Sequence, residues 1–136
     1  MDAKSPFVFP VRVYYEDTDA GGVVYHANYL KYLERARSEW LRNLGFSQET
    51  LRTQEKLAFV VHHVDILFRR PARLDDELKV SVMVETVRET RVYFQQTIER
   101  DGECLIKARV EVVALDIERF KAVKVPSYIW QEQHAS

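Results

Sequence analysis

Three carboxylates and one histidine lie in a short segment near the start of the chain, from Tyr14 to Asn28. The acids are Glu16, Asp17 and Asp19, and the histidine is His26. The strongest helical pattern of the chain begins directly afterwards, so free N–H groups and the positive end of a helix dipole should lie beside Asp19 and His26. An ionised carboxylate next to such donors suits the binding of an electrophile. The sequence therefore predicts a reactive corner between a turn and a helix N-terminus.

Two glycines and a short apolar run separate Asp19 from His26. Gly21 and Gly22 allow a sharp turn or a close approach to a ligand, because glycine has no Cβ. The apolar residues 23–25 indicate that the segment enters a buried pocket, since a merely soluble turn would not need them. The alternative is a polar turn between a strand and a helix, in which Asp19 is a cap and His26 is structural. Local composition leaves both interpretations open.

The helix that must position this corner is predicted over Asn28 to Leu44. Apolar side chains recur there at steps of three and four residues, and Gly45 provides a C-terminal stop. At 1.5 Å per residue the helix would be ~25 Å long, enough to cross a sheet. Its apolar positions are Tyr29, Leu33, Ala36, Trp40 and Leu44.

Patterns typical of β-strands precede and follow this helix, with a short second helix expected over residues 47–54. Asp101-Gly102 is the clearest hairpin turn. The order predicts an α+β domain in which an antiparallel five-stranded sheet wraps one long central helix. We expect a single domain over 1–136, with a core of about 7–125 and a tail over 126–136. The predicted strands are Phe7–Tyr15, Phe59–Phe68, Glu77–Val87, Arg91–Glu99 and Cys104–Asp116.

Composition narrows the possible partners. The chain has 20 basic and 21 acidic residues, so no charge bias points to nucleic acid or an anionic membrane surface. Cys104 is the only cysteine, which fits a reducing compartment and a free thiol. Charges interrupt every apolar run and the N-terminus does not resemble a secretory signal, so we expect a cytoplasmic protein without a membrane span.

Other chemistries find little support. His62 and His63 are adjacent in a predicted strand and would point to opposite faces, so no metal site is predicted. The chain has no P-loop, no G-x-G-x-x-G and no G-x-S-x-G motif. We therefore predict no cofactor, and carboxylate chemistry remains.

The motif D-x-D-A-G-G-V-V-Y-H-A-N-Y-L-K-Y-L-E-R-A-R resembles the signature of hotdog-fold thioesterases of the 4-hydroxybenzoyl-CoA thioesterase family. The similarity is strongest to its YbgC-type, Tol-Pal-associated acyl-CoA thioesterases. The segment FVVHHVDILFRRPARLDDELKV resembles the strand-turn-strand region of the same group, so the resemblance runs from about Val11 to about Val125. It implies a hotdog fold and the hydrolysis of acyl-CoA thioesters to free acid and CoA.

The resemblance also implies roles for single residues. Asp19 matches the catalytic carboxylate of the family, acting as nucleophile or as base for water, and the backbone N–H at His26 would hold the carbonyl oxygen. The His26 ring would polarise the carbonyl or position water, with Tyr15, Gly22 and Asn28 in support. Because 4-hydroxybenzoyl-CoA thioesterase itself carries another residue at the His26 position, short- to medium-chain aliphatic acyl groups are favoured over aromatic ones.

Arginines near predicted strand ends are candidates for binding the phosphates of CoA. They are Arg70, with its neighbour Arg69, and the pair Arg88 and Arg91. The alternative is an ordinary solvated strand edge.

The resemblance further implies a homodimer or homotetramer in which two sheets join side by side. Acyl-carrier protein is a further candidate partner. Two other functions remain open: a non-catalytic acyl-CoA or acyl-carrier-protein binder of envelope or phospholipid metabolism, and, less supported, a hotdog hydratase or dehydratase.

Overall fold

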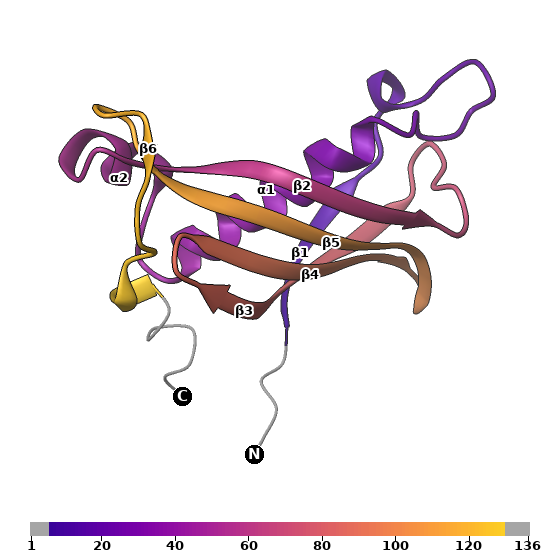
Figure 1. The fold of residues 1–136 in the computed structure, drawn as a ribbon. Coiled ribbons are helices and arrows are strands. Elements are labelled where there is room, and N and C mark those ends of the chain that lie inside the picture. The colour runs from indigo at the N-terminus through magenta and orange to yellow at the C-terminus, as the bar shows by residue number, and fades with distance from the viewer. Residues whose placement is uncertain (1–5, 130–136) are drawn as a thin grey trace.

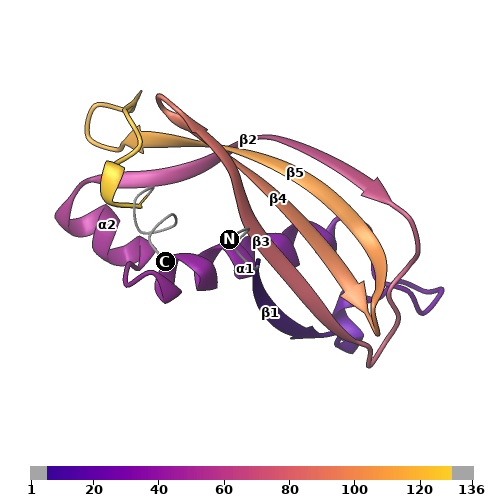
Figure 2. The same cartoon turned by 90° about the horizontal axis from the view of Figure 1, so that it is seen from below.

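The computed structural model describes residues 6–129 and shows one long helix lying along a curled antiparallel sheet (Figure 1). The sheet curves over the helix when it is seen from below (Figure 2). In chain order the elements are β1 (Phe7–Arg12), a 3₁₀ turn (Tyr15–Asp17), α1 (Asn28–Asn43), α2 (Gln48–Gln54), β2 (Leu57–Phe68), β3 (Glu77–Arg88), β4 (Arg91–Arg100), β5 (Glu103–Asp116) and β6 (Lys121–Ala122). The predicted fold class is confirmed.

The strands follow the order β1-β3-β4-β5-β2, and every neighbouring pair is antiparallel. Strands β1 and β2 therefore form the two edges. The β4–β5 hairpin turns at Asp101 and Gly102, whose φ angles of 50° and 81° are both positive. This is the geometry expected of an Asp-Gly hairpin turn, so the prediction for that pair is confirmed.

Two element boundaries differ by two or more residues from the sequence prediction, and one strand was not predicted. The first strand ends at Arg12 rather than Tyr15, because the Asp17 carboxylate accepts a hydrogen bond from the Tyr14 N–H at 2.9 Å and bends the chain into the 3₁₀ turn. Strand β2 begins at Leu57, two residues early. The sixth strand, β6, was not predicted, since a two-residue strand has no readable period; it extends the predicted five-stranded sheet beside β5.

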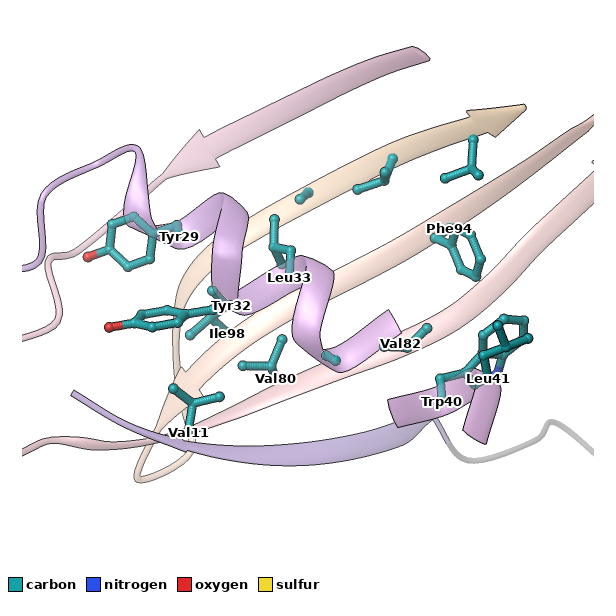
Figure 3. Close-up of a cluster of buried hydrophobic side chains, with 14 of the residues drawn as sticks. Val11, Tyr29, Tyr32, Leu33, Trp40, Leu41, Val80, Val82, Phe94 and Ile98 are labelled. Atoms are coloured by element: carbon teal, nitrogen blue, oxygen red, sulfur yellow. The ribbon is translucent and has the colours of Figure 1, made fainter. Parts of the chain in front are cut away.

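The core lies between α1 and the concave face of the sheet (Figure 3). The Trp40 and Phe94 rings meet edge to face with their centroids 5.2 Å apart. This packing fixes the helix along its length and so fixes where its N-terminus lies. The buried residues of α1 are Tyr29, Tyr32, Leu33, Ala36, Trp40 and Leu41.

Near the C-terminus, the Tyr128 ring packs 5.1 Å from the Phe46 ring, and residues 130–136 of the predicted tail lie outside the described residues. Within residues 6–129, no helix is both long enough and apolar enough to cross a bilayer.

A buried polar side chain ties the helix to the sheet. Gln96 is only 1% exposed, and its amide nitrogen donates to the backbone oxygens of Leu33 and Ser81, each at 3.2 Å. Its amide oxygen accepts a hydrogen bond from Nη1 of Arg37 at 2.9 Å. One side chain thus joins α1, β3 and β4, and buried groups of this kind are costly to leave unpaired.

We predict that Gln96→Ala lowers the free energy of unfolding by about 2–3 kcal/mol, because its buried partners lose their hydrogen bonds. Gln95→Ala is the matched control, since Gln95 is the exposed neighbour on the same strand and should change stability by less than about 0.5 kcal/mol. Urea denaturation of both variants measures the difference. Equal stability of the two variants would contradict the role of Gln96.

Candidate active site

Asp17 holds both ends of the loop that carries the predicted site. Its carboxylate binds the Tyr14 N–H, and the side chain is only 8% exposed. Its backbone oxygen accepts hydrogen bonds from the Tyr25 N–H at 3.0 Å and from Nδ2 of Asn28 at 2.9 Å. The loop between them is therefore closed at its base, and Asn28, one of the predicted supporting residues, is part of this closure.

Asp19 lies in a tight turn at the exposed tip of this loop. Its backbone N–H donates to the Val23 oxygen at 2.9 Å, and its backbone oxygen accepts from the Gly22 N–H at 3.0 Å. One carboxylate oxygen accepts from the Gly21 N–H at 2.8 Å, while the other makes no hydrogen bond to any described residue. The turn therefore fixes the carboxylate and leaves one oxygen open.

The backbone conformation and the close packing of the turn explain why both positions are glycine. Gly22 has a φ of +80°, a conformation that side chains with a Cβ rarely adopt. A Cβ on Gly21 would lie 3.3 Å from the Asp19 carboxylate, which is tighter than an ordinary contact. The glycine pair thus allows the carboxylate to lie against the backbone.

Helix α1 begins at Asn28 after Ala27, which provides no side-chain cap. The backbone N–H groups of Asn28 and Tyr29 bond back to the oxygens of Tyr25 and His26 at 2.8 and 3.3 Å. The N–H of His26, in contrast, makes no hydrogen bond to any residue in the range 6–129. A backbone donor is therefore available next to the positive end of the helix dipole.

The His26 side chain is exposed and lies over an open cavity of about 340 Å³. Its ring is 4.5 Å from the Tyr25 ring and 6.4 Å from the Phe68 ring, measured between centroids. Phe68, at the end of β2, is 50% exposed. The cavity therefore combines apolar surface with a histidine ring and two arginines, and it is lined by Val24, His26, Tyr29, Phe68, Arg69, Arg70 and Pro71.

The loop after β2 supports the site loop through a residue without a polar side chain. The Ala72 oxygen accepts from the Val24 N–H at 2.8 Å, and the Ala72 N–H donates to the Tyr29 hydroxyl at 2.9 Å. Burial raises the pKa of Tyr29, so its hydroxyl stays neutral at physiological pH. The site loop and the start of α1 are thus fastened to one backbone unit.

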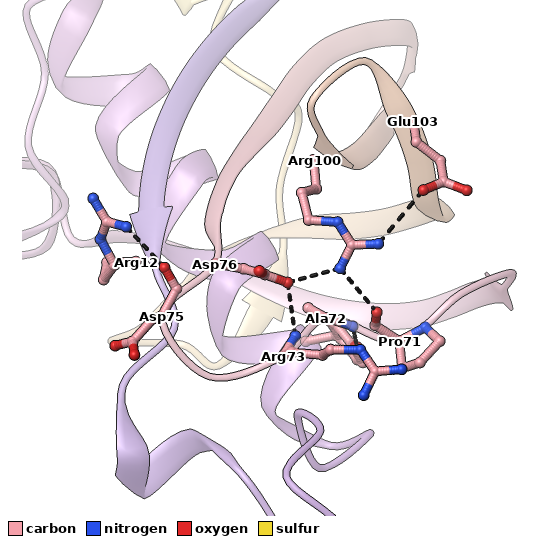
Figure 4. Close-up of polar contacts among 9 residues, drawn as sticks. Arg12, Pro71, Ala72, Arg73, Asp75, Asp76, Arg100 and Glu103 are labelled. Atoms are coloured by element: carbon pink, nitrogen blue, oxygen red, sulfur yellow. Dashed lines mark hydrogen bonds and ion pairs between the residues drawn. The ribbon is translucent and has the colours of Figure 1, made fainter.

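An ion pair anchors this supporting loop (Figure 4). Nη1 of Arg100 donates to the Asp76 carboxylate at 2.7 Å and to the Pro71 oxygen at 3.3 Å. The same Asp76 oxygen accepts from the Arg73 N–H at 2.8 Å. Burial alone would raise the pKa of Asp76, but these hydrogen bonds outweigh it and lower the pKa below its ordinary value.

The arginines predicted to bind CoA phosphates lie at two different ends of the sheet. Arg70 lines the His26 cavity and pairs with Glu103 at 2.6 Å. Arg88 and Arg91 lie at the opposite end of the sheet, where Arg91 pairs with Glu111. A single protomer therefore does not bring Arg70 together with Arg88 and Arg91.

Tyr15 lies on the 3₁₀ turn with 82% of its surface exposed, and its side chain makes no hydrogen bond to a described residue. The supporting roles of Ala72 and Arg100 were not predicted. No local sequence pattern could reveal them. Ala72 acts through its backbone alone, and Arg100 is 24 residues away from Asp76 in the sequence.

A curled antiparallel sheet around one central helix, with a loop and helix N-terminus at one end, defines the hotdog class of α+β domain. The thioesterase-like superfamily matches residues 13–132. The chain therefore belongs to the thioesterase-like superfamily, which confirms the resemblance found in the motif.

Relatives of known sequence extend over nearly the whole chain. The acyl-CoA thioesterase YbgC of Haemophilus influenzae is 49% identical over 123 residues, which are 90% of each chain. The acyl-CoA thioester hydrolase YbgC of Escherichia coli O157:H7 is 45% identical over 127 residues, covering 93% of this chain and 94% of the relative. The solved structure of a probable thioesterase from Bartonella henselae has a TM-score of 0.86 at 39% identity, covering 90% of this chain and all of that one.

The lowered pKa of Asp76 gives a pH-dependent prediction. A carboxyl group whose pKa is lowered on folding stabilises the fold above its unfolded pKa, and this contribution is lost as the pH falls through the folded pKa. We expect Asp76→Asn to lower the free energy of unfolding at pH 7 by roughly 1–3 kcal/mol. The variant should also lose stability less steeply than the native protein below about pH 4.

Denaturant unfolding between about pH 2 and pH 7 measures both effects. Asp75→Asn is the control, since Asp75 is exposed in the same turn and only its backbone is hydrogen bonded, to Arg12 and Val13. If Asp76→Asn kept the pH profile of the native protein, the Arg100 ion pair would not be the anchor of this loop.

Proposed function

We propose that the protein hydrolyses acyl-CoA thioesters to a free acid and CoA. The observation that carries the proposal is the geometry of one corner: a fixed Asp19 carboxylate with an open oxygen, in the loop that leads to an unpaired His26 N–H at the start of α1. The thioesterase relatives at 45–49% identity support the same reaction.

Asp19 and the His26 N–H each have a role in the proposed thioester hydrolysis. Asp19 attacks the thioester carbon directly or takes a proton from the water that attacks it. The carbonyl oxygen gains negative charge, which the His26 N–H and the helix dipole stabilise. The C–S bond then breaks and CoA leaves as a thiolate, which needs little acid assistance. If Asp19 attacked directly, a water molecule then hydrolyses the acyl-Asp19 anhydride and frees the carboxylate. In both routes water supplies the oxygen of the free acid and the proton that the thiolate takes up.

The walls of the His26 cavity offer apolar surface to an acyl group. Phe68 and Val24 supply apolar surface, and the His26 ring lies at the side where it can orient the thioester or a water molecule. We propose short- to medium-chain aliphatic acyl-CoA as substrate, with acyl-carrier-protein esters as the alternative. Arg70 at the rim is the candidate for contact with a phosphate of either carrier.

We infer a homodimer that forms through the edge strand β2. This edge carries four large apolar side chains with 43–53% of their surface exposed, and an uncovered strand edge of this kind invites pairing. Two copies of β2 paired antiparallel over their full length place Leu57 opposite the partner's Phe68. The exposed apolar residues of the edge are Val60, Val61, Leu67 and Phe68.

The two-fold axis of such a pair stands perpendicular to the sheet, so both helices remain on the same face. It also brings the end of the sheet that carries Arg88 and Arg91 toward the partner's His26 corner. Homodimers, or tetramers built from them, would therefore reunite the arginines that one protomer separates. With a single cysteine and a CoA substrate, we place the protein in the cytoplasm.

We predict that Asp19→Asn reduces kcat/KM for a short-chain acyl-CoA by at least about a hundredfold, because an amide can neither attack nor accept a proton. Glu16→Gln is the matched control on the same exposed loop and should retain activity. Thiol release from a series of acyl-CoAs measures the rates. If the native protein bound acyl-CoA but cleaved none of the series, it would instead be a non-catalytic binder of acyl-CoA or acyl-carrier protein.

We also predict that Val60→Asp converts the native oligomer to monomers at micromolar concentration, since a charge would be buried in the β2 edge. Val8→Asp on the opposite edge strand is the matched control, because both valines are 47% exposed. Light scattering after size-exclusion chromatography gives the mass of each. A native monomer, or a dimer that survives Val60→Asp, would contradict pairing through β2.

A further inference from the structure

A second cavity, of about 110 Å³, lies between the C-terminal half of α1 and strands β2, β4 and β5. Its walls are mainly aromatic and aliphatic, with Trp40, Phe59 and Phe94 among them. Two charged residues of α1, Glu34 and Arg37, also line it. At roughly 30 Å³ for each group the size of a water molecule, the cavity holds three or four such groups.

Arg37 is half-buried, and part of its guanidinium group remains open to solvent. Its Nη1 donates to the Gln96 oxygen, and the remaining donors bond to no residue of the chain that the structure describes. Glu34, one turn away, interacts through its charge, but its carboxylate accepts its hydrogen bond from Ser38. Burial lowers the pKa of Arg37 to about 10, so the side chain remains charged at neutral pH.

A charged group with open donors beside an apolar cavity can bind an acceptor on a ligand in place of water. Guanidinium donors match the two oxygens of a carboxylate best, and they can also donate to the single oxygen of a hydroxyl group. The charge of Glu34 acts on Arg37 from the exposed side of the helix. A ligand that suits this cavity therefore carries an oxygen for Arg37 and carbon for the aromatic and aliphatic walls.

The antiparallel pairing of β2 explains how a substrate reaches this cavity. Within one protomer, the cavity lies near the opposite end of α1 from His26. In the paired dimer, however, Phe59 on the wall of the cavity lies opposite the partner's Ile66, two residues from the partner's Phe68. Because Phe68 contacts His26 in each protomer, the partner's reactive corner lies beside this cavity.

We propose that the cavity receives the far end of the acyl group of a thioester bound at the partner's His26 corner, and that Arg37 selects acyl groups with a hydroxyl or carboxylate oxygen at that end. This inference rests on the proposed thioesterase function and on the β2 dimer. It makes Arg37 a specificity residue that acts at a distance from the bond that breaks.

The test compares three acyl-CoAs of equal chain length: hexanoyl-CoA, 6-hydroxyhexanoyl-CoA and adipoyl-CoA. The native protein should show a kcat/KM at least about tenfold higher for one of the two oxygen-bearing substrates than for hexanoyl-CoA, as expected when a charged donor gains an acceptor. Which of the two is preferred tells whether the acceptor is a hydroxyl or a carboxylate. In Arg37→Gln the preference should fall by about tenfold, while hydrolysis of hexanoyl-CoA remains.

Arg35→Gln is the matched control, because Arg35 is an exposed arginine on the same helix. Arg37→Lys keeps the charge but not the planar donor array and should retain only part of the preference. A native protein that cleaves all three substrates at similar rates overturns the proposal even if the Arg37 variants fail to fold. So does an Arg37→Gln variant that slows all three equally. Neither result affects the thioesterase function, which hexanoyl-CoA hydrolysis reports separately.

Discussion

The hydrogen bonds of Asp17 are the constraint on which the reactive corner depends. Its carboxylate takes the Tyr14 N–H and ends the first strand, while its backbone oxygen takes donors from Tyr25 and Asn28 at the start of α1. One buried residue thus sets where the strand ends, how the loop closes and where the helix begins. Because unpaired buried polar groups are costly, these bonds hold the loop in one arrangement.

The rest of the structure holds this loop against two rigid supports. One is α1, whose buried face is fixed by the core and by Gln96. The other is the turn after β2, where Ala72 bonds to both the site loop and α1. Asp19 itself stays exposed at the tip. Such a division is typical of functional loops, which gain mobility and access at the tip only when their base is anchored.

Much of the fold followed from periodicity, but the supports of the site did not. The period of 3.6 in residues 28–44 and the Asp-Gly turn placed α1 and the β4–β5 hairpin within a residue, because these signals are local. Alternation places Gln96 on the face of Phe94 and Ile98, but no local pattern shows that its amide bonds to the backbone of α1 and β3. The anchor of Asp76 by Arg100 depends on pairing between strands far apart in the chain, which no local pattern encodes.

Each protomer has a different site near each end of strand β2. The reactive corner lies where β2 ends, and the cavity with Arg37 lies near where β2 begins. Any antiparallel pairing of two identical β2 edges must place the end of one strand beside the beginning of the other. If the edge is the interface, then each reaction site joins the corner of one chain to the cavity of its partner. Catalysis and the choice of acyl group then reside in different subunits, and the register of a single strand pair sets the distance between them.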